Sequence, residues 1–444
     1  MIVEVFITPV DNSGNYSLPE VNATQWLARE GAISKINNTV DNSDFVVGVF
    51  SFSYTKIRLQ NRDGLFSEAG GISIFPYQRD ESRVRIQLRD IDTQETFQLF
   101  SGLISDDATK EDDLNELISF TIISSDAVLS RHNVPVGIVP NQIRYKQALL
   151  LLLDRTPINN ILNIDESRID LDYNGIIENG ESFTDKSVSE AVNEILVAAN
   201  SILYVDENDN LHIAVRTSPR TIQAQYYGPF DEIRRDPKIL AVRKINNGYH
   251  RMINQVKIDR QFFNDPTYID AFGLKSKTLE LDFLLTAGEK AKVANNLIKR
   301  YRYPKREMTI VVPIRHAYSL LPTSLVAVEY EKKLSRPGGD GEFSRYDIAE
   351  YDVGEYPGEH GSLYVSPSLG WIVYGIQHDV TNFITEIKLR EYGTESGDAV
   401  IFDVPNTYDF ALYDRNEYES DDGIELVSSV GYYDSGFYDL SEYS

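Results

Sequence analysis

The stretch of residues 54–67, YTKIRLQNRDGLFS, constrains the fold more than any other part of the chain. Ile57 and Leu59 alternate with polar residues, which is the period-two pattern of a strand with one buried face. The NRDG sequence that follows supplies residues that tolerate turn geometry, after which the strand is expected to resume at Leu65 and Phe66. This arrangement favours an antiparallel sheet.

A second strand pair is predicted after the Gly70-Gly71 break. Arg83–Arg89 alternates strictly between polar and apolar residues, and residues 97–104 complete a hairpin through a loop at 90–95. Taken by themselves, these patterns predict a small antiparallel β barrel or sandwich.

Four short motifs in this region resemble a known family. They are NRDGLFS at 61–67, RVRIQLR at 83–89, FSGLISD at 100–106 and SSDAVLS at 124–130. Together they resemble the first barrel domain of phage tail hub proteins, the baseplate hubs at the end of the tail tube of long-tailed bacteriophages. The resemblance extends over residues 1–393. None of its motifs is catalytic, so it implies a structural protein of the virion.

Length and cysteine content set further limits. A chain of 444 residues is too long for one hydrophobic core and predicts about three domains. No run of 18 apolar residues occurs, so no stable membrane insertion is expected, and residues 1–10 do not have the pattern of a secretory signal. Because the chain has no cysteine, a disulfide, a thiolate metal site and a cysteine nucleophile are all excluded.

The net charge is −25, from 43 Lys and Arg against 68 Asp and Glu. Binding to phosphates needs clustered cations, so no sequence-specific nucleic-acid binding is expected. A negative channel wall would let DNA pass without sticking, although a solvated surface is the commoner reason for such acidity.

The N-terminal barrel is predicted over residues 1–125, with strands at Ile2–Thr8 and 44–53 on its outside and a loop at 11–20. A connector with two prolines at 134–140 suggests a domain change. The small α/β domain predicted for residues 126–225 would contain two helices, at 142–154 and 187–200, and a hairpin at 202–215. The second helix has a capping box, Ser187 and Glu190, and its helix-then-hairpin order resembles the α/β domain of the hub family.

Residues 226–393 are predicted to form a second domain of hub type. Another capping box, Thr286 and Glu289, precedes a helix at 287–301 that ends before Pro304. Strands are predicted at 254–259, 277–283, 308–314, 325–330, 371–377 and 383–390. They complete what resembles the second barrel of a hub protein. The predicted fold class is therefore a mixed, β-rich α+β fold with two small antiparallel β barrels and an inserted α/β domain.

Two segments depart from a minimal hub: an insertion at 331–369 and an acidic, Tyr-rich C-terminal extension at 394–444. The extension has 13 Asp or Glu and one base, Arg415, and so carries −12 of the net charge of −25. The motif YDxxxYDxxEY occurs once in the insertion and twice in the extension. Its repeated Tyr and Asp residues are Tyr346, Asp347, Tyr351, Asp352, Tyr356, Tyr408, Asp409, Tyr413, Asp414, Tyr418, Tyr433, Asp434, Tyr438, Asp439 and Tyr443.

The spacing of these tyrosines puts them on one face of neither a helix nor a strand, so the motif favours a series of short turns. Tyrosine offers large, rigid contact area and the acids steer toward basic surfaces, which predicts a docking peptide. Its central anchors would be Tyr351, Tyr413 and Tyr438. The alternative is an acidic tail whose tyrosines pack on the barrel of the same chain.

Catalytic motifs are not found. Residues 338–341 lack the Lys-Ser/Thr of a phosphate loop, no GxSxG occurs, and the six histidines show no HxxxH spacing. No catalytic residue and no cofactor is predicted, and the protein is not expected to be an enzyme.

A calcium-loop pattern is the sharpest single match. Asp170, Asp172, Asn174 and Glu181 would be its metal ligands. Against this, the next helix begins only after Ser187, and residues 170–173 alternate like a strand that turns at Asn174-Gly175. The hairpin is therefore the favoured interpretation, and calcium is the alternative.

The resemblance implies a trimeric hub at the tail tip or baseplate, since two barrels per chain would give six units around a channel. Such a hub would join the tail tube or a distal tail protein to fibre, spike or adaptor proteins, the last through the Tyr-Asp repeats. The alternative is a polysaccharide-binding or depolymerising tail-tip protein, whose grooves would use the 11% of aromatic residues.

Overall fold

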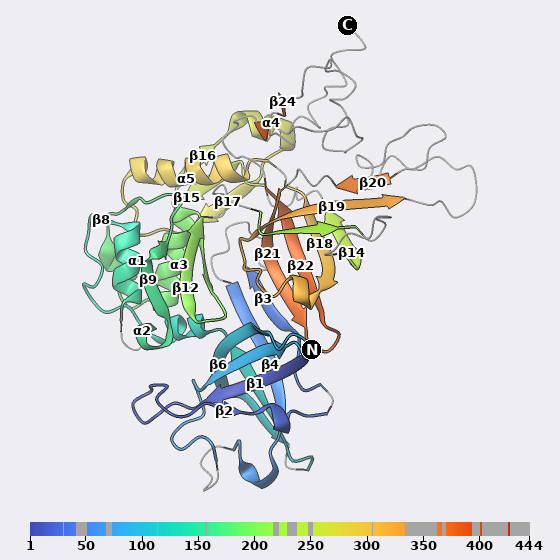
Figure 1. The fold of residues 1–444 in the computed structure, drawn as a ribbon. Coiled ribbons are helices and arrows are strands. Elements are labelled where there is room, and N and C mark those ends of the chain that lie inside the picture. The colour runs from blue at the N-terminus through green and yellow to red at the C-terminus, as the bar shows by residue number, and fades with distance from the viewer. Residues whose placement is uncertain are drawn as a thin grey trace.

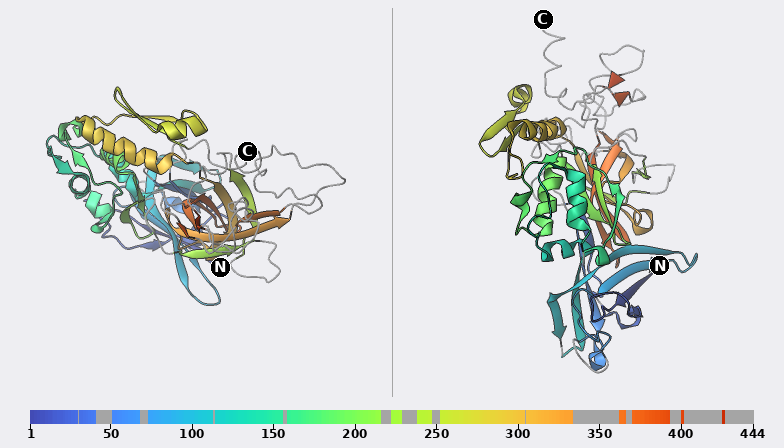
Figure 2. Two further views of the ribbon diagram at one scale, coloured as in Figure 1. Left: turned by 90° about the horizontal axis from the view of Figure 1, so that it is seen from above. Right: turned by 90° about the vertical axis from the view of Figure 1, so that its left-hand side faces the viewer.

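The computed structural model describes residues 1–29, 31–40, 51–67, 73–112, 114–155, 158–215, 222–228, 238–246, 252–303, 305–333, 362–365, 370–392, 400–401 and 425–426 (Figure 1). We divide these residues into an N-terminal sheet unit, an α/β unit and a C-terminal sheet unit. Figure 2 shows the N-terminal sheet unit at the bottom of its right-hand view and the C-terminal sheet unit above it. No helix in the described ranges is long and apolar enough to cross a membrane.

The N-terminal sheet unit contains seven strands in the order β3-β4-β7-β6-β5-β1-β2, with antiparallel pairing throughout. They are β1 (Ile2–Thr8), β2 (Val21–Asn22), β3 (Ile36–Val40), β4 (Ser51–Gln60), β5 (Arg83–Arg89), β6 (Thr96–Asp112) and β7 (Leu117–Ile123). The predicted alternation is confirmed, because every second residue of β5 and β7 is buried. The β5–β6 hairpin is confirmed as well.

The segment between β2 and β3 brings the two ends of this strand set together. β2 pairs with β1, and two isolated bridges farther along, Leu27 to Leu59 and Ile33 to Ile57, continue the pairing along β4. The strands therefore surround one apolar core, to which Val5, Ile57, Ile86 and Phe120 belong.

The prediction that the β4 strand resumes at Leu65 and Phe66 is wrong. A 3₁₀ turn at Arg62–Gly64 follows β4, with positive φ at Asp63 and Gly64, and the chain then leaves the sheet. Phe66 is instead fully buried and packs edge-to-face against Trp26 and Phe120. A large apolar side chain after a turn is compatible with core packing as well as with a strand. Most of the outer strand predicted at 44–53 lies outside the described residues, and β4 begins at Ser51.

The α/β unit combines two small sheets, a two-stranded pair and most of the helices. Its elements are β8 (Ile143–Arg144), α1 (Tyr145–Leu153), α2 (Ile158–Ile161), β9 (Asn163–Ile169), β10 (Ile176–Ile177), α3 (Val188–Ala199), β11 (Ser201–Val205), β12 (Asn210–Val215), β15 (Gln255–Ile258), β16 (Gln261–Asn264), α4 (Pro266–Phe272), β17 (Ser276–Leu279) and α5 (Ala287–Tyr301). The two sheets have the orders β11-β12-β9 and β16-β15-β17. The predicted β11–β12 hairpin is confirmed.

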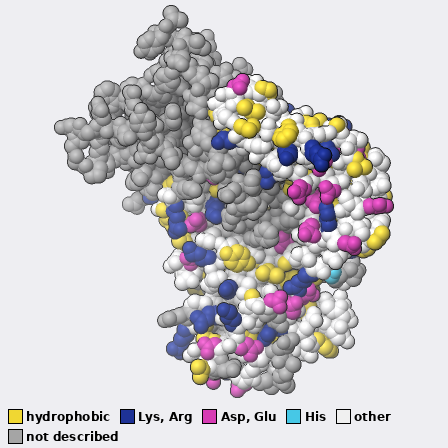
Figure 3. Space-filling view, turned by 180° about the vertical axis from the view of Figure 1, so that it is seen from behind, with side chains coloured by type: hydrophobic (Ala, Val, Ile, Leu, Met, Phe, Trp, Pro, Cys, Tyr) yellow, Lys and Arg dark blue, Asp and Glu magenta, His cyan; other side chains and the backbone are white. Residues whose placement is uncertain are grey.

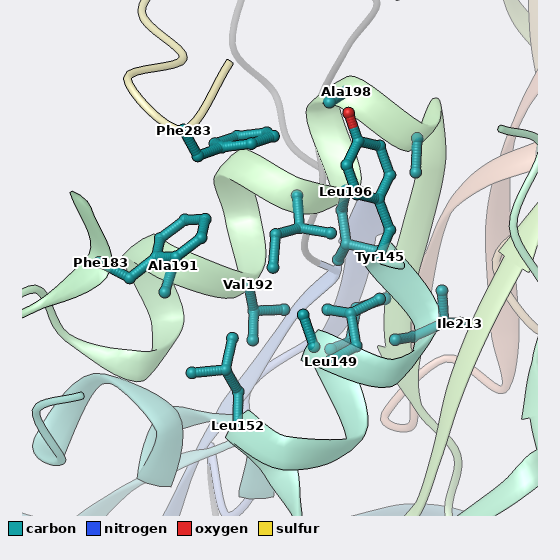
Figure 4. Packing of buried hydrophobic residues seen from close by; sticks show 14 of the residues in the cluster. Tyr145, Leu149, Leu152, Phe183, Ala191, Val192, Leu196, Ala198, Ile213 and Phe283 are labelled. Carbon is teal, nitrogen blue, oxygen red and sulfur yellow. The ribbon is translucent and has the colours of Figure 1, made fainter. Parts of the chain in front are cut away.

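Helix α3 forms as the sequence predicts. Both hydrogen bonds of the capping box between Ser187 and Glu190 are present, and the helix ends at Asn200 in the left-handed conformation. The apolar side of α3, with Val192 and Leu196, faces Leu149 and Leu152 of α1 (Figure 4). Helix packing thus builds the centre of the α/β unit.

Helix α5 has the predicted bounds, but only half of its capping box forms. The Thr286 side chain accepts a hydrogen bond from the Glu289 backbone N–H, whereas the Thr286 N–H donates to Glu178, 2.8 Å away. The Glu289 carboxylate accepts from Tyr173 and Lys292 instead. One of the two local capping hydrogen bonds is therefore replaced by a contact with Glu178, in a distant segment of the α/β unit.

The α5 helix also belongs to a different core from the one predicted. Val293, Leu297 and Tyr301 share a buried cluster with α1 and α3, together with Val256 of β15. Residues 253–301, predicted within the second barrel domain at 226–393, thus pack into the α/β unit. The domain boundaries at 125, 225 and 393 stay predictions.

The C-terminal sheet unit is formed by β13 (Ala224–Tyr227), β14 (Ala241–Asn246), β18 (Glu307–Pro313), β19 (Leu325–Lys333), β20 (Ser362–Val365), β21 (Gly370–Asp379) and β22 (Ile384–Glu391). Its core contains Tyr226, Met308, Val328 and Trp371. A separate strand pair, β23 (Val400–Ile401) with β24 (Glu425–Leu426), lies in the extension.

The two sheet units are not separate, because β21 pairs with β3. This ladder joins them into one 14-stranded sheet, whose main path runs β14-β18-β22-β21-β3-β4-β7-β6-β5-β1-β2. The described strands therefore support a β-rich fold with large antiparallel sheets, and the two barrels stay a prediction.

Candidate assembly surfaces

The joint between the two sheet units combines backbone pairing with shared packing. β21 and β3 pair from Gly375–Thr39 to His378–Ile36, and the Gln377 side chain donates to Asn37. Two apolar residues of the C-terminal part, Ile314 and Val380, belong to the core of the N-terminal sheet unit. A rigid joint is the expected consequence, since separating the units would expose these side chains to water.

His378 lies within this joint and is buried. Its Nδ1 is 2.8 Å from the Oγ1 of Thr385, which is also buried. Burial lowers the pKa of His378 from 6.5 to about 4, because the imidazolium would lose its hydration there. The joint therefore contains a neutral histidine at neutral pH.

A second joint attaches the α/β unit to the N-terminal sheet unit through Asp209. This residue has positive φ in the turn between β11 and β12, and its carboxylate accepts from Ser125 at 2.6 Å and from Ser101 at 3.0 Å. The guanidinium of Arg83 is 3.1 Å from the same carboxylate and lies over the Tyr16 ring. One buried acid thus connects strands β5 and β6 to the α/β unit.

Burial is the largest influence on Asp209 and raises its pKa, although Arg83 and the two serines act in the opposite direction. The sequence alone gave no reason to single out Asp209, because an Asp-Asn turn is ordinary hairpin chemistry. Only the fold brings Arg83, Ser101 and Ser125 to it.

Two of the four calcium-loop residues, Asp172 and Asn174, have separate partners. The Asp172 carboxylate binds Arg300 at 2.5 Å and accepts from the amides of Asn200 and Asn296. The Asn174 side chain accepts from the Lys146 backbone N–H, and its backbone carbonyl accepts from Arg144. Among the described residues, no group of three His, Cys, Asp or Glu is placed to hold a metal ion.

The hairpin predicted at Asn174-Gly175 is wrong too. Residues 170–175 form no strand, and β10 pairs with β8 rather than with the residues before the turn. Gly175 is needed here for another reason, since a Cβ would come within 2.7 Å of the Tyr145 ring. The DxDxNG pattern therefore serves a close approach to α1 and an ion pair to α5.

We predict that calcium is dispensable for stability. Treatment with a chelator should leave the melting temperature unchanged, whereas a true site would stabilise the protein by on the order of a few kcal/mol at saturating metal. The measurement is thermal unfolding with chelator and with added calcium. A fall in melting temperature that calcium restores and Asp170→Ala abolishes would contradict the prediction.

Four cations lie on the solvent face of the N-terminal sheet unit, and we call them, with Tyr54, the basic face. On β4, Lys56 and Arg58 follow Tyr54 at the alternate positions that point away from the core, and Lys56 is exposed. Lys35 adjoins Lys56, because Ser34 and Lys56 exchange hydrogen bonds. Lys110 of β6 and Arg58 both pair across β7 with Ser119.

These four cations have no ion-pair partner in the described part of the chain. The cations of neighbouring β5 differ, since Arg83, Arg85 and Arg89 are each paired with a carboxylate. The view from behind shows Lys and Arg over the N-terminal sheet unit, with Asp and Glu among them (Figure 3). In a chain of net charge −25, this surface stands out. Sequence alternation placed Lys56 and Arg58 on a polar face, but it did not show that they have no ion-pair partner among the described residues.

The docking residues predicted in the Tyr-Asp repeats, from Tyr346 to Tyr356, Tyr408 to Tyr418 and Tyr433 to Tyr443, lie outside the described residues. The insertion at 331–369 is likewise described only at the end of β19 and at β20. The repeats remain a prediction from sequence.

Comparison with known proteins supports the fold. No family model matches the sequence, and no curated protein matches it. Among solved structures, the tail protein from Neisseria meningitidis MC58 is 13% identical with a TM-score of 0.51, over 88% of this chain and 96% of that chain. The tail protein of prophage MuSo2 from Shewanella oneidensis is 12% identical with a TM-score of 0.49, over 88% of this chain and 98% of that chain.

A prophage tail protein from Listeria monocytogenes EGD-e is 9% identical with a TM-score of 0.46, over 87% of this chain and 94% of that chain. At such identities the likeness concerns the fold alone. The resemblance to phage tail proteins is thereby confirmed for the fold.

Proposed function

We propose that this chain, which has the fold of the phage tail hub proteins, is a non-enzymatic structural hub at the tail tip or baseplate. The observation that carries the proposal is the continuous sheet that joins two strand sets through β21 and β3. A tail component must transmit force without its domains separating, and a ladder with shared core residues provides this rigidity.

In this role the chain assembles as a homotrimer. Two sheet units per chain then give six similar units around a channel, which matches a hexameric tail tube. Because the units differ in sequence, three copies can meet a sixfold partner on one side and threefold partners on the other.

The first test is the mass of the assembly. We expect native mass spectrometry of the purified protein, or of isolated tail tips, to give three times the mass of one chain. Incubation with glycans should release no shorter products, which separates the hub from a depolymerase. A stable monomer both in solution and in the particle would exclude the hub.

The Tyr-Asp repeats are proposed to dock a fibre, spike or adaptor protein. Deletion of residues 394–444 should leave the trimer intact and remove that protein from the tail tip, because two of the three repeats are lost. The composition of purified particles, measured by quantitative mass spectrometry, gives the result. If truncated particles keep every fibre, the repeats do not perform this docking.

A further inference from the structure

The basic face offers three cations and one aromatic ring to a partner. Lys56 and Lys110 are exposed, and Arg58 lies in one row with Lys110, because both pair across β7 with Ser119. Tyr54 lies on the same side of β4, and 48% of it is exposed. Positive charge therefore surrounds an exposed aromatic side chain.

Charged residues at the margin of the basic face are already engaged. The Lys35 Nζ donates to Gln377 at 3.4 Å and lies near Asp379. The Asp112 carboxylate lies near Arg58, but it accepts hydrogen bonds from the turn that follows β6. The other three cations thus determine the charge that a partner meets.

A second surface, on the α/β unit, has the opposite charge. We call Glu178, Glu181, Glu194, Asp282 and Leu285 the acidic face. The Glu178 carboxylate accepts from the backbone N–H of Leu285 at 2.6 Å. Burial is the largest cause that raises the pKa of Glu194, and the nearby charge of Asp282 raises it further. Leu285 is 62% exposed, so an apolar side chain lies among these acids.

Packing between two segments brings the acids of this face together. The rings of Phe183 and Phe283 are 5.3 Å apart, which places Glu181 and Asp282 on neighbouring turns. Both acids are exposed and have no ion-pair partner among the described residues. Lys186 pairs with one other acid of the face, at 2.6 Å, so the face keeps a net negative charge.

Within one chain the two faces do not meet. The α/β unit is attached to the N-terminal sheet unit through Asp209, and no described carboxylate of the acidic face pairs with Lys56, Arg58 or Lys110. A second copy supplies the acidic face that the basic face lacks. Such a contact between unlike faces is head-to-tail, and a closed ring uses each face of every chain once.

We propose that the basic face of one copy docks on the acidic face of the next copy, with Tyr54 against Leu285. The three cations then lie opposite the carboxylates, which fixes the partner and the register. The two apolar side chains are buried at the centre, where contacts contribute most to binding. The inference rests on the proposed homotrimer and names the surfaces through which its copies meet.

Charge reversal in the full-length protein tests this contact. Lys56→Glu with Lys110→Glu makes both faces acidic and should raise the concentration at which half of the trimers dissociate by about tenfold or more. Glu181→Lys with Asp282→Lys makes both faces basic and should have the same effect. Mass photometry over a dilution series gives this concentration, and far-UV circular dichroism verifies that each variant is folded.

A matched control separates the contact from general repulsion. Lys275→Glu with Lys299→Glu changes the net charge as much as the reversal of the basic face does, at two cations outside both faces. These trimers should dissociate at the wild-type concentration. Raising the salt concentration should weaken the wild-type trimer, because salt screens the contact between the faces.

A charge-swapped chain carries both reversals at once, Lys56→Glu, Lys110→Glu, Glu181→Lys and Asp282→Lys. Its faces are again complementary, so its trimer should dissociate within about threefold of the wild-type concentration. When it is mixed with isotopically labelled wild type, native mass spectrometry should detect separate trimers. Mixed trimers are disfavoured because every mixed contact brings like charges together.

Because the chain has no cysteine, disulfide trapping can locate Tyr54 in the assembly. Tyr54→Cys with Leu285→Cys should give linked dimers and trimers on non-reducing gels after mild oxidation. The matched control is Tyr54→Cys with Phe262→Cys, a position on β16 that is 59% exposed. The control should stay unlinked.

The inference is wrong if the reversed chains form trimers as stable as the wild type, if the charge-swapped chain is no more stable than either reversed chain, or if the cysteine control links equally. The first result is expected if the basic face binds another tail component or an acidic segment of its own chain. A trimeric wild type with any of these results leaves the hub proposal intact. A wild type that is monomeric in solution and in the particle overturns both.

Discussion

Replacing Glu391 by alanine is expected to destabilise the C-terminal sheet unit by about 3–5 kcal/mol, because it removes the carboxylate that forms a bidentate ion pair with the buried Arg306 guanidinium. The two side chains form a two-pronged ion pair, with Nε–Oε2 and Nη2–Oε1 distances of 2.9 Å. Only 10% and 11% of the Arg306 and Glu391 side chains are exposed. The backbones of the same two residues are also hydrogen-bonded, at the end of β22 from which the extension departs.

The direction of the Glu391 pKa agrees with this expectation. Burial alone would raise the pKa, but the nearby Arg306 charge and its hydrogen bonds outweigh burial and hold the pKa below its usual value. The ion pair is thus formed at neutral pH.

Denaturant unfolding measures the effect, and the two tryptophans allow the units to be followed separately. Trp371 lies in the core of the C-terminal sheet unit, whereas Trp26 packs against that of the N-terminal sheet unit. In a Trp26→Phe background, Trp371 fluorescence reports the C-terminal unit. Glu386→Ala, which removes the more exposed ion pair with Arg243, is the matched control and should cost less than about 1 kcal/mol.

A double substitution shows whether the loss of stability in Glu391→Ala comes from the missing carboxylate charge or from lost packing. Arg306→Met with Glu391→Leu should recover much of the lost stability, because a well-packed apolar pair leaves no buried charge. If Glu391→Ala lowers the free energy of unfolding no more than Glu386→Ala does, the ion pair is not a structural requirement.

The second large effect is a loss of stability on acidification, caused by His378 in the joint between the sheet units. Its folded pKa of about 4 lies below the 6.5 expected for an exposed histidine. Between these values the unfolded chain binds a proton that the folded chain does not, so stability falls as pH decreases from 6.5 to 4. The difference in pKa corresponds to about 3 kcal/mol.

Other groups titrate in the same range, so the contribution of His378 must be measured by difference. Burial raises the pKa of Asp126 to about 6, and its protonation acts in the opposite direction because the folded state binds that proton first. Protonation of ion-paired carboxylates lowers the free energy of unfolding further at lower pH.

The experiment compares the free energy of unfolding of the wild type and His378→Gln from pH 7 to pH 4. Glutamine can keep a hydrogen bond to Thr385 but has no charge to acquire. The variant should therefore lose about 3 kcal/mol less than the wild type over this range. Asp126→Asn tests the opposing contribution. If the free energy of unfolding depends on pH in the same way in the wild type and in His378→Gln, His378 does not cause the loss of stability on acidification.

Local patterns in the sequence were sufficient for several elements. The alternation in Arg83–Arg89 defines a strand with one buried face, since side chains of a strand point to opposite sides in turn. Ser187 and Glu190 define the start of α3, because the capping hydrogen bonds join residues three positions apart. The bounds of α5 were also predicted correctly, although half of its capping box was not.

The candidate surfaces were less accessible to sequence reasoning. The Tyr-Asp repeats are visible only as a sequence pattern, and they lie outside the described residues. The basic face, by contrast, depends on the fold, since Arg58 and Lys110 come from strands β4 and β6 and Lys35 from the segment before β3. The DxDxNG pattern was misleading, because Asp172 binds Arg300, which lies 128 residues away in the chain.

What the sequence alone determined was therefore the set of strands and helices whose signals extend over a few neighbouring residues. The tertiary structure decided how these elements combine: β21 pairs with β3, α5 packs in the α/β unit, and Asp209 meets Arg83. The physical reason is that all strand edges present the same backbone donors and acceptors, so local pattern cannot select a partner. That choice depends on shape and burial over the whole molecule.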